Sequence, residues 1–199
     1  MSGPRRLQIA FLVVSGGVVV VIGAALALYL IAGSPGLSGK APLVEIQSVD
    51  TLRSQFNQDA GKIRLILFLS PTSPVCLAGT RWLQLDILGQ QPTDSLRVYA
   101  VWMPMLPGDS RDSWDGGYLS DYRVLHYWDE GRLTGTWFAQ EVDGLEGVSW
   151  NTYYLFEPHA SWESVPSPPQ DSGGTIRDRA MILRAHLLYL IWELTGNPT

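Results

Sequence analysis

A long uncharged run near the N-terminus precedes shorter apolar segments that alternate with amphipathic ones. Residues Ile9–Ala32 contain no charged side chain over 24 positions. A helix of that length rises about 36 Å, enough to cross a hydrocarbon core of about 30 Å. Arg5 and Arg6 precede the run, and the positive-inside rule places that side in the cytoplasm. The pattern predicts a cell-membrane protein with residues 1–8 cytoplasmic, a transmembrane helix over 9–32, and the remaining chain periplasmic or extracellular.

A removed secretory signal is the alternative interpretation of the same run. Such signals usually have an apolar core of about 7–15 residues that ends at a small-x-small site. The candidate site, Ala25-Leu-Ala27, lies inside the run, so cleavage there would leave apolar residues behind. We therefore expect an uncleaved anchor in the lipid bilayer. Gly23 and Ala27 form a small-x-x-x-small pair, which lets a helix of another subunit approach closely.

The remaining pattern predicts a linker and one α/β domain. Residues 33–42 are rich in Gly, Ser and Pro, so the exported domain is expected over residues 43–199. Strands are predicted at Pro42–Gln47, Ile63–Leu69, Leu96–Trp102 and Thr152–Phe156, with Ala160–Trp162 as a candidate to pair with the last. Helices are predicted at Val49–Gln58, Ala78–Leu88 and Thr175–Leu194. Residues 109–142 are predicted to be irregular and then helical, and residues 165–174 to form a solvated loop. The alternation indicates an α/β sandwich.

Composition narrows the possible functions. Residues 43–199 carry all 19 acidic residues, and the sequence has only two lysines, Lys40 and Lys62. From residue 37 onward there are 12 basic residues, which gives a formal charge of −7. This balance argues against nucleic-acid binding, which needs a basic surface. The single cysteine excludes an internal disulfide and a thiolate zinc site.

The segment Ile63–Gly79 (IRLILFLSPTSPVCLAG) is the one in which chemistry is expected. A buried strand leads through a short loop to Cys76 at the start of a predicted helix. The positive end of the helix dipole lowers a thiol pKa and favours a reactive thiolate. A small buried hydrophobe near a helix start is the alternative role for this cysteine.

These residues resemble the thioredoxin superfamily, in which a strand end delivers Cys-x-x-Cys onto the following helix. Here the four residues are Ser73-Pro-Val-Cys76, so Ser73 stands where the attacking cysteine would be and Cys76 matches the second cysteine. In that family a cis-Pro-Thr step precedes a later strand, and the matching dipeptide here is Asn151-Thr152. The resemblance implies a thioredoxin-like domain over about Val44–Leu194 whose site at Ser73, Cys76 and Asn151 is a relict.

The sequence contains no clear motif for a metal, acid–base, phosphate-binding or serine-hydrolase site. The three histidines are not within helical or hairpin reach of one another or of the cysteine, so no metal site is expected. Asp109 with Asp112, or Asp129 with Glu130, could pair for acid–base work, but acids on a loop surface are more often solvated. Phosphate-binding and serine-hydrolase glycine motifs are missing, and no cofactor is expected.

Two further features suggest contact with a partner. Trp114 lies in a polar loop, where its ring either contacts a partner or folds back over the core. The C-terminal helix should bury Ile176, Ala180, Leu183, Leu187, Leu190 and Leu194 and expose a polar strip of Arg179, His186 and Glu193. Met181, Leu188 and Trp192 form a second apolar stripe that needs another cover: the 165–174 loop, a partner subunit or the bilayer surface.

Together these inferences predict a non-catalytic, single-pass accessory subunit with a thioredoxin-like domain. It would dock on, and stabilise, a larger membrane protein complex. We suggest an energy-converting complex, although no residue of the sequence points to it. The alternative is a monothiol redox protein or thiol-dependent chaperone that uses Cys76. A ligand-binding module that uses the family's active-site groove is a third class, without a residue signature of its own.

Overall fold

The computed structural model describes residues 41–116 and 118–196. The predicted anchor, its Gly23 and Ala27, and nearly all of the predicted linker lie outside these residues. No helix within the described ranges is long and apolar enough to cross a membrane.

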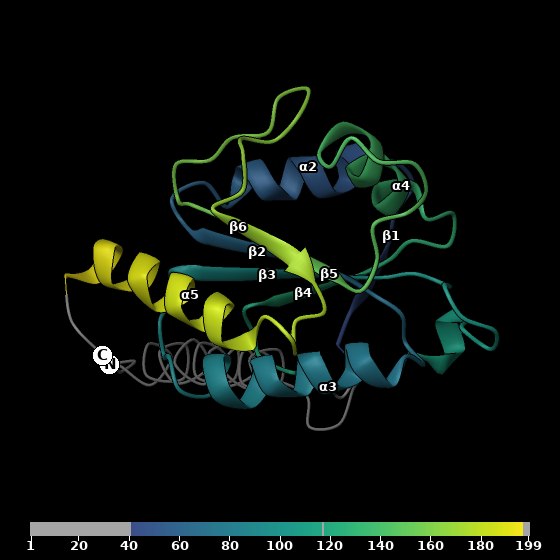
Figure 1. Ribbon diagram of the computed structural model, residues 1–199, viewed down its shortest axis with the longest axis horizontal. Coiled ribbons are helices and arrows are strands. Elements are labelled where there is room, and N and C mark those ends of the chain that lie inside the picture. The colour runs from purple at the N-terminus through teal and green to yellow at the C-terminus, as the bar shows by residue number, and fades with distance from the viewer. Residues whose placement is uncertain (1–40, 117, 197–199) are drawn as a thin grey trace, which may run out of the picture. The chain divides into compact units, whose positions relative to one another are not determined.

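A six-stranded mixed sheet forms the centre of the domain (Figure 1). Its strands are β1 (Leu43–Glu45), β2 (Ile63–Leu69), β3 (Leu96–Trp102), β4 (Val124–Trp128), β5 (Thr152–Phe156) and β6 (Asp171–Gly174), in the order β1-β4-β3-β2-β5-β6. The first four strands in this order run parallel, whereas β5 is antiparallel to β2 and to β6. The α/β class expected from the sequence is confirmed.

Helices cover both faces of the sheet. One layer contains α2 (Val49–Gln58) and α4 (Leu133–Glu141), and the other contains α3 (Pro74–Trp82), its π-helical continuation η1 (Leu83–Leu88) and α5 (Ala180–Thr195) (Figure 1). A short 3₁₀ turn, η2 (Arg111–Ser113), lies between β3 and β4.

The apolar run of β2 is continuous because helices cover both of its sides. All seven residues of β2 are buried. Alternate positions point to opposite faces of a sheet. Ile63, Leu65, Leu67 and Leu69 accordingly join the core beneath α3 and α5. Ile66 and Phe68 join the core beneath α2 and α4.

Four predictions of local structure were wrong. Residues Val124–Trp128, expected to be irregular, form a strand between β1 and β3. Ala160–Trp162 does not pair with β5, which instead pairs with Asp171–Gly174 from the expected loop. The sequence Asp-Ser-Gly-Gly has low β propensity, so edge pairing with β5 determines its conformation. The last helix begins at Ala180 rather than Thr175, and Gly196 ends it in the left-handed region.

Candidate functional site

The loop after β2 is organised around the first turn of α3. Ser73 is the N-cap residue, and its hydroxyl accepts a hydrogen bond from the backbone N–H of Cys76 at 3.4 Å. Pro74 follows at the first helical position, where its missing N–H removes no helical bond. Ser73 is 5% exposed, so its side chain acts as a helix cap in the place where the resemblance implies an attacking thiol.

Cys76 lies at the start of α3 but is closed off from solvent. It is 1% exposed, and its Sγ donates to Oδ1 of Asn151 at 3.5 Å. Burial raises the pKa of the thiol, and the Asp109 carboxylate raises it further, against hydrogen bonds at Ser70 and Ser73 that lower it. The expectation that the helix dipole would lower this pKa is therefore wrong, because loss of hydration outweighs it. The thiol stays protonated at neutral pH.

Asn151 is brought to the cysteine by its position just before β5. Its φ is 53°, in the left-handed region that asparagine tolerates better than most residues. Its carbonyl accepts from the backbone N–H of Thr175 at 2.7 Å, and Thr175 itself has a φ of 32°. The Thr152 hydroxyl donates to the carbonyl of Gly173 at 2.7 Å and so links strand β5 to strand β6. The structure thus brings together all three residues of the proposed relict, Ser73, Cys76 and Asn151.

Asp109 holds the loop that leads into this site. Its carboxylate accepts from both the hydroxyl and the backbone N–H of Thr72, at 2.6 and 3.1 Å, and from the hydroxyl of Ser70 at 2.8 Å. It also accepts from the backbone N–H groups of Met105 and Leu106, both at 2.8 Å. Burial alone would raise the pKa of Asp109, but these donors outweigh it and hold that pKa below its ordinary value. From the sequence, Asp109 was considered only as a solvated acid that could pair with Asp112, so its role in holding this loop was not predicted.

The other acid pair considered in the sequence is also structural. Asp129 is fully buried and accepts from the backbone N–H groups of Leu133 and Thr134, both at 2.8 Å, so it caps α4. The carboxylate of Glu130 accepts from the indole N–H of Trp128 at 2.8 Å. Each carboxylate therefore has a local hydrogen-bonding role, and the two do not form an acid–base pair.

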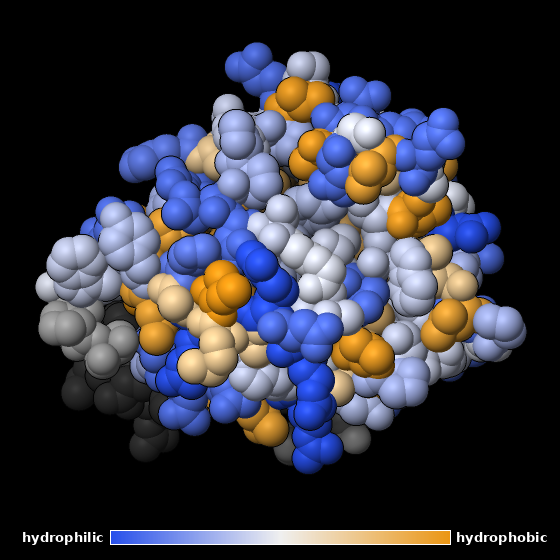
Figure 2. Space-filling model, viewed as in Figure 1, coloured by the Kyte–Doolittle hydropathy of each residue, from blue (hydrophilic) through white to orange (hydrophobic). Residues whose placement is uncertain are grey.

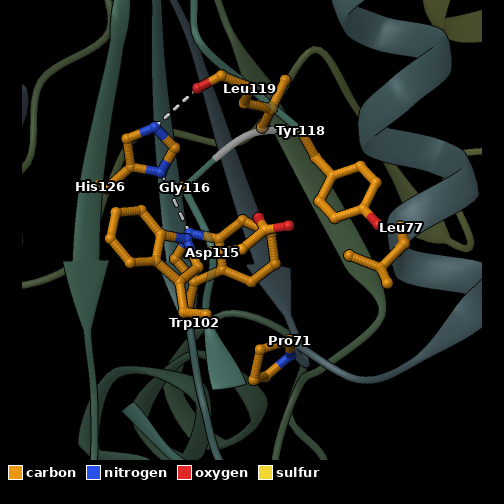
Figure 3. A pocket seen from close by; sticks show the side chains of 9 residues that line it. Pro71, Leu77, Trp102, Asp115, Gly116, Tyr118, Leu119 and His126 are labelled. Atoms are coloured by element: carbon orange, nitrogen blue, oxygen red, sulfur yellow. Dashed lines mark hydrogen bonds between the residues drawn. The ribbon is translucent and has the colours of Figure 1, made fainter. Parts of the chain in front are cut away.

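A closed aromatic cluster lies beside the loop (Figure 3). Nδ1 of His126 accepts from the indole N–H of Trp102 at 3.1 Å, so Nε2 carries the proton and donates to the carbonyl of Leu119 at 2.9 Å. Burial lowers the pKa of His126 and keeps its ring neutral. The cavity between these side chains measures about 10 Å³, which is room for about one water molecule and not for an organic ligand.

Trp114 belongs to this cluster. It is 5% exposed, and its ring centroid lies 5.2 Å from that of His126. Of the two roles that the sequence left open, the structure shows the ring folded over the core. The expectation of an exposed partner contact at Trp114 is wrong, because the loop that carries it packs back against β4.

The polar strip expected on α5 is only partly solvated. Asp171 of β6 accepts from the hydroxyl of Tyr153 at 2.7 Å and from the guanidinium of Arg179 at 3.0 Å. Nδ1 of His186 lies 3.2 Å from the same carboxylate. Arg179 and His186 therefore fasten α5 to the sheet edge, and of the three only Glu193 is exposed as predicted. Sequence reasoning missed this cluster because Asp171 was assigned to a loop.

The second apolar stripe of α5 lies at the surface. Met181 is 78% exposed and Trp192 is 49% exposed, whereas Leu188 is partly buried. Residues 171–174 of the proposed covering loop are paired with β5, and the loop leaves the stripe open. The buried stripe agrees with prediction at Ile176, Leu183, Leu187 and Leu190, but Ala180 is only partly buried and Leu194 is 39% exposed. Within the described ranges, no three His, Cys, Asp or Glu side chains are placed to bind a metal ion together.

Comparisons with known proteins give little beyond this geometry. No model of a protein family and no curated protein matches the sequence. A thioredoxin-like protein solved in its oxidised form matches with a TM-score of 0.45 and 19% identity, over 64% of this chain and 78% of that one. A Neisseria meningitidis protein described as a thioredoxin matches with a TM-score of 0.40 and 19% identity, over 65% and 76%. Likeness at this level carries no inference about chemistry.

Proposed function

We propose that this chain is a membrane-anchored, non-catalytic accessory subunit with a thioredoxin-like domain, which docks on and stabilises a larger membrane protein complex. The observation that carries the proposal is that Cys76 is buried and hydrogen-bonded. It is the single thiol of the sequence, it is 1% exposed, and it is hydrogen-bonded to Asn151. Disulfide exchange needs an accessible thiolate to attack and a second thiol to release the product.

The topology supports the thioredoxin-like part of the proposal. A central strand ends in the loop that carries the motif, the motif cysteine begins a helix, and Asn151 faces that cysteine from the start of an antiparallel strand. This is the arrangement that the resemblance implies, with serine in place of the attacking cysteine and asparagine in place of the cis-proline. The fold is kept, and the residues of the site contribute to its packing.

The anchor supports the membrane part of the proposal. Residues 9–32 are uncharged and long enough to cross a bilayer, and Gly23 and Ala27 offer a close-packing surface to another helix. In such an arrangement the contact with the complex lies at least partly within the membrane. The exported domain would then be held beside its partner by a short tether.

The test is purification of the full chain from its own cell membranes in mild detergent, with identification of co-purifying subunits. We expect a constant set of membrane subunits with the wild-type chain and with Cys76→Ser. Gly23→Leu combined with Ala27→Leu should release that set. The matched control is Val21→Leu combined with Ala25→Leu, which enlarges side chains elsewhere on the same run and should retain it.

Two outcomes would contradict the proposal. Purification without partner subunits would remove the accessory role. Release of the partners by a reductant, or their loss in Cys76→Ser, would favour the monothiol redox protein or thiol-dependent chaperone.

A further inference from the structure

A cleft of about 610 Å³ lies between the start of α2 and helix α4. Gln47 and Ser48 follow the carboxyl end of β1, and Gly131 follows the carboxyl end of β4, which is the parallel neighbour of β1. The carboxyl ends of parallel strands lie at the same end of a sheet, so the two loops meet there and line one cleft. Its volume falls within the range of about 300–1,000 Å³ that is typical of small-molecule sites.

Helix α4 presents one face to this cleft. The side chains of α4 that line it recur at i, i+3, i+4 and i+7, which is the spacing of a single helix face. They are Leu133, Thr136, Trp137 and Gln140. Phe138 lies on another face of the helix and is buried against the sheet. The lining face of α4 is therefore separate from the face that builds the core.

Trp137 provides a fixed aromatic surface in the cleft. Its ring centroid lies 5.4 Å from that of Phe138 and 5.1 Å from that of Trp162. The side chain is only partly buried, so the rest of the ring is open to the cleft. Leu133, which is 44% exposed, and Val49 complete the apolar part of the lining. A ring that is already held in place loses little conformational entropy when a ligand packs on it.

The polar part of the lining is neutral and has unused hydrogen-bonding capacity. Four polar side chains of the cleft have no hydrogen-bond partner among the described residues: Gln47, Ser48, Thr136 and Gln140. Ser48 is the N-cap residue of α2, but its hydroxyl makes no cap bond. No charged side chain lines the cleft in the part of the chain that the structure describes. Figure 2 shows hydrophobic and hydrophilic residues interspersed at the surface around α4, which is labelled at the upper right of Figure 1.

A neutral saccharide matches this combination of groups. Amide and hydroxyl side chains both donate and accept hydrogen bonds, and so do the hydroxyls around the rim of a sugar ring. The faces of the ring carry C–H groups, which pack on an aromatic side chain. A charged ligand would have no counter-charge in the lining, and a wholly apolar ligand would leave the polar side chains without partners.

We propose that the cleft between α2 and α4 binds a neutral saccharide, with a sugar ring packed on Trp137 and its hydroxyls bonded to the side chains of Gln47 and Gln140. The cleft lies in the α2 and α4 layer, whereas Ser73 and Cys76 lie at the start of α3 in the other layer. The site uses neither the thiol nor the membrane anchor. It therefore goes beyond the proposed function and is tested separately from it.

The experiment is saturation-transfer-difference NMR with the full chain in phosphatidylcholine nanodiscs, which contain no sugar headgroup. The probes are three neutral disaccharides, cellobiose, maltose and N,N′-diacetylchitobiose, and empty nanodiscs are the blank. At least one probe should receive saturation that rises to a plateau on titration, with the C–H protons of one ring face receiving the most. The absence of a plateau for all three probes up to about 10 mM would overturn the proposal.

Variants of the lining locate the binding. Gln47→Ala and Gln140→Ala replace exposed side chains, and each should weaken binding of the sugar about fivefold through loss of a hydrogen bond. Gln58→Ala is the matched control, because Gln58 is exposed at the far end of α2, and it should leave the affinity unchanged. Trp137→Leu should abolish binding. If circular dichroism shows that Trp137→Leu does not fold, the two glutamine variants decide the question.

Two further results would count against a saccharide site in this cleft. Equal affinity in the wild type, Gln47→Ala and Gln140→Ala would mean that the sugar binds elsewhere, and the proposal would be wrong. A proline-rich peptide of twelve residues, tested in the same nanodiscs, is expected not to bind. Binding of that peptide without binding of any sugar would assign the cleft to a protein partner and would also overturn the proposal.

Discussion

Arg64 is a buried cation in the middle of an apolar strand. Its guanidinium donates to the carbonyls of Phe56, Glu157, Pro158 and Ala160 at 2.7–3.0 Å, and it lies over the Phe56 ring at 4.1 Å from the centroid. Replacing it removes the donor from the carbonyls of Phe56 and Ala160, whereas those of Glu157 and Pro158 keep backbone N–H donors. Each unsatisfied buried group costs about 1–3 kcal/mol. We expect Arg64→Met to lower the free energy of unfolding by about 3 kcal/mol or more.

Urea unfolding of Arg64→Met tests this prediction, with Arg177→Met as the control variant. Arg177 is exposed, so its replacement should change stability by less than about 0.5 kcal/mol. Equal stability of the two variants would show that the carbonyl cluster does not depend on the guanidinium. The sequence could not reveal this role, because a lone arginine in an apolar run gives no indication of which carbonyls will surround it.

Acid should destabilise the domain in two stages. Burial lowers the pKa of His126, so the folded chain resists a proton that the unfolded chain accepts below about pH 6.5. The pKa values of Asp59, Asp109 and Asp171 also lie below the ordinary value of 3.8, because hydrogen-bond donors outweigh burial. Their stabilisation is complete above about pH 4 and is lost as pH falls through the lowered values.

Denaturant titrations between pH 7 and pH 2.5 test this pH dependence. Stability should fall gently below pH 6.5 and more steeply below pH 4. Asp109→Asn should be less stable at pH 7 and show a shallower decline below pH 4. A wild-type stability that stays constant down to pH 3 would contradict the assigned pKa directions.

At the scale of elements, α5 has two apolar faces with different roles. Leu187 is fully buried, whereas its neighbour Leu188 is partly buried on the outer face beside Trp192. Leu188→Glu combined with Trp192→Glu should therefore leave a folded domain whose stability changes by about 1 kcal/mol or less. Leu187→Glu alone should unfold the domain, because it buries an unpaired carboxylate. Loss of fold in the double variant, measured by circular dichroism, would assign the outer stripe to the domain's own core.

The elements that the sequence predicted well are those with a strong local pattern. The apolar runs at Ile63–Leu69 and Leu96–Trp102 became β2 and β3 with the predicted boundaries. By contrast, β6 was missed because Asp171–Gly174 has no strand pattern of its own and depends on pairing with β5. Trp114 was placed correctly in a loop, but its burial depends on contact with His126, which no local pattern records.

The proposed relict site, like the fold, was predictable where neighbouring residues determine the structure and not where distant residues do. The position of Cys76 at the start of a helix agrees with expectation, whereas the helix cap at Ser73 was not predicted and the helix begins at Pro74 rather than Ala78. The pKa direction of Cys76 was wrong, because burial by distant segments and the charge of Asp109 decide it. Asn151 was placed opposite Cys76 through the resemblance alone, and the hydrogen bond between them agrees with that placement.

For the whole molecule, the fate of residues 9–32 decides where the domain works. The length of the apolar run and the position of Arg5 and Arg6 predict that it is retained as an anchor. N-terminal sequencing and intact mass of the mature chain should show that residues 9–32 are present. A mature chain that starts after Ala27 or Ala32 would instead identify the run as a removed signal.

The central claim is that the chain acts without thiol chemistry, and the reaction rate of Cys76 in the folded protein tests it most directly. Native protein is treated with a thiol-reactive disulfide reagent at pH 7.5, and the rate is compared with that of the same protein in denaturant. Because Cys76 is 1% exposed and its pKa is raised, we expect the native rate to be at least a hundredfold slower. A native rate equal to or faster than the denatured rate would show an accessible thiolate and would contradict the non-catalytic account.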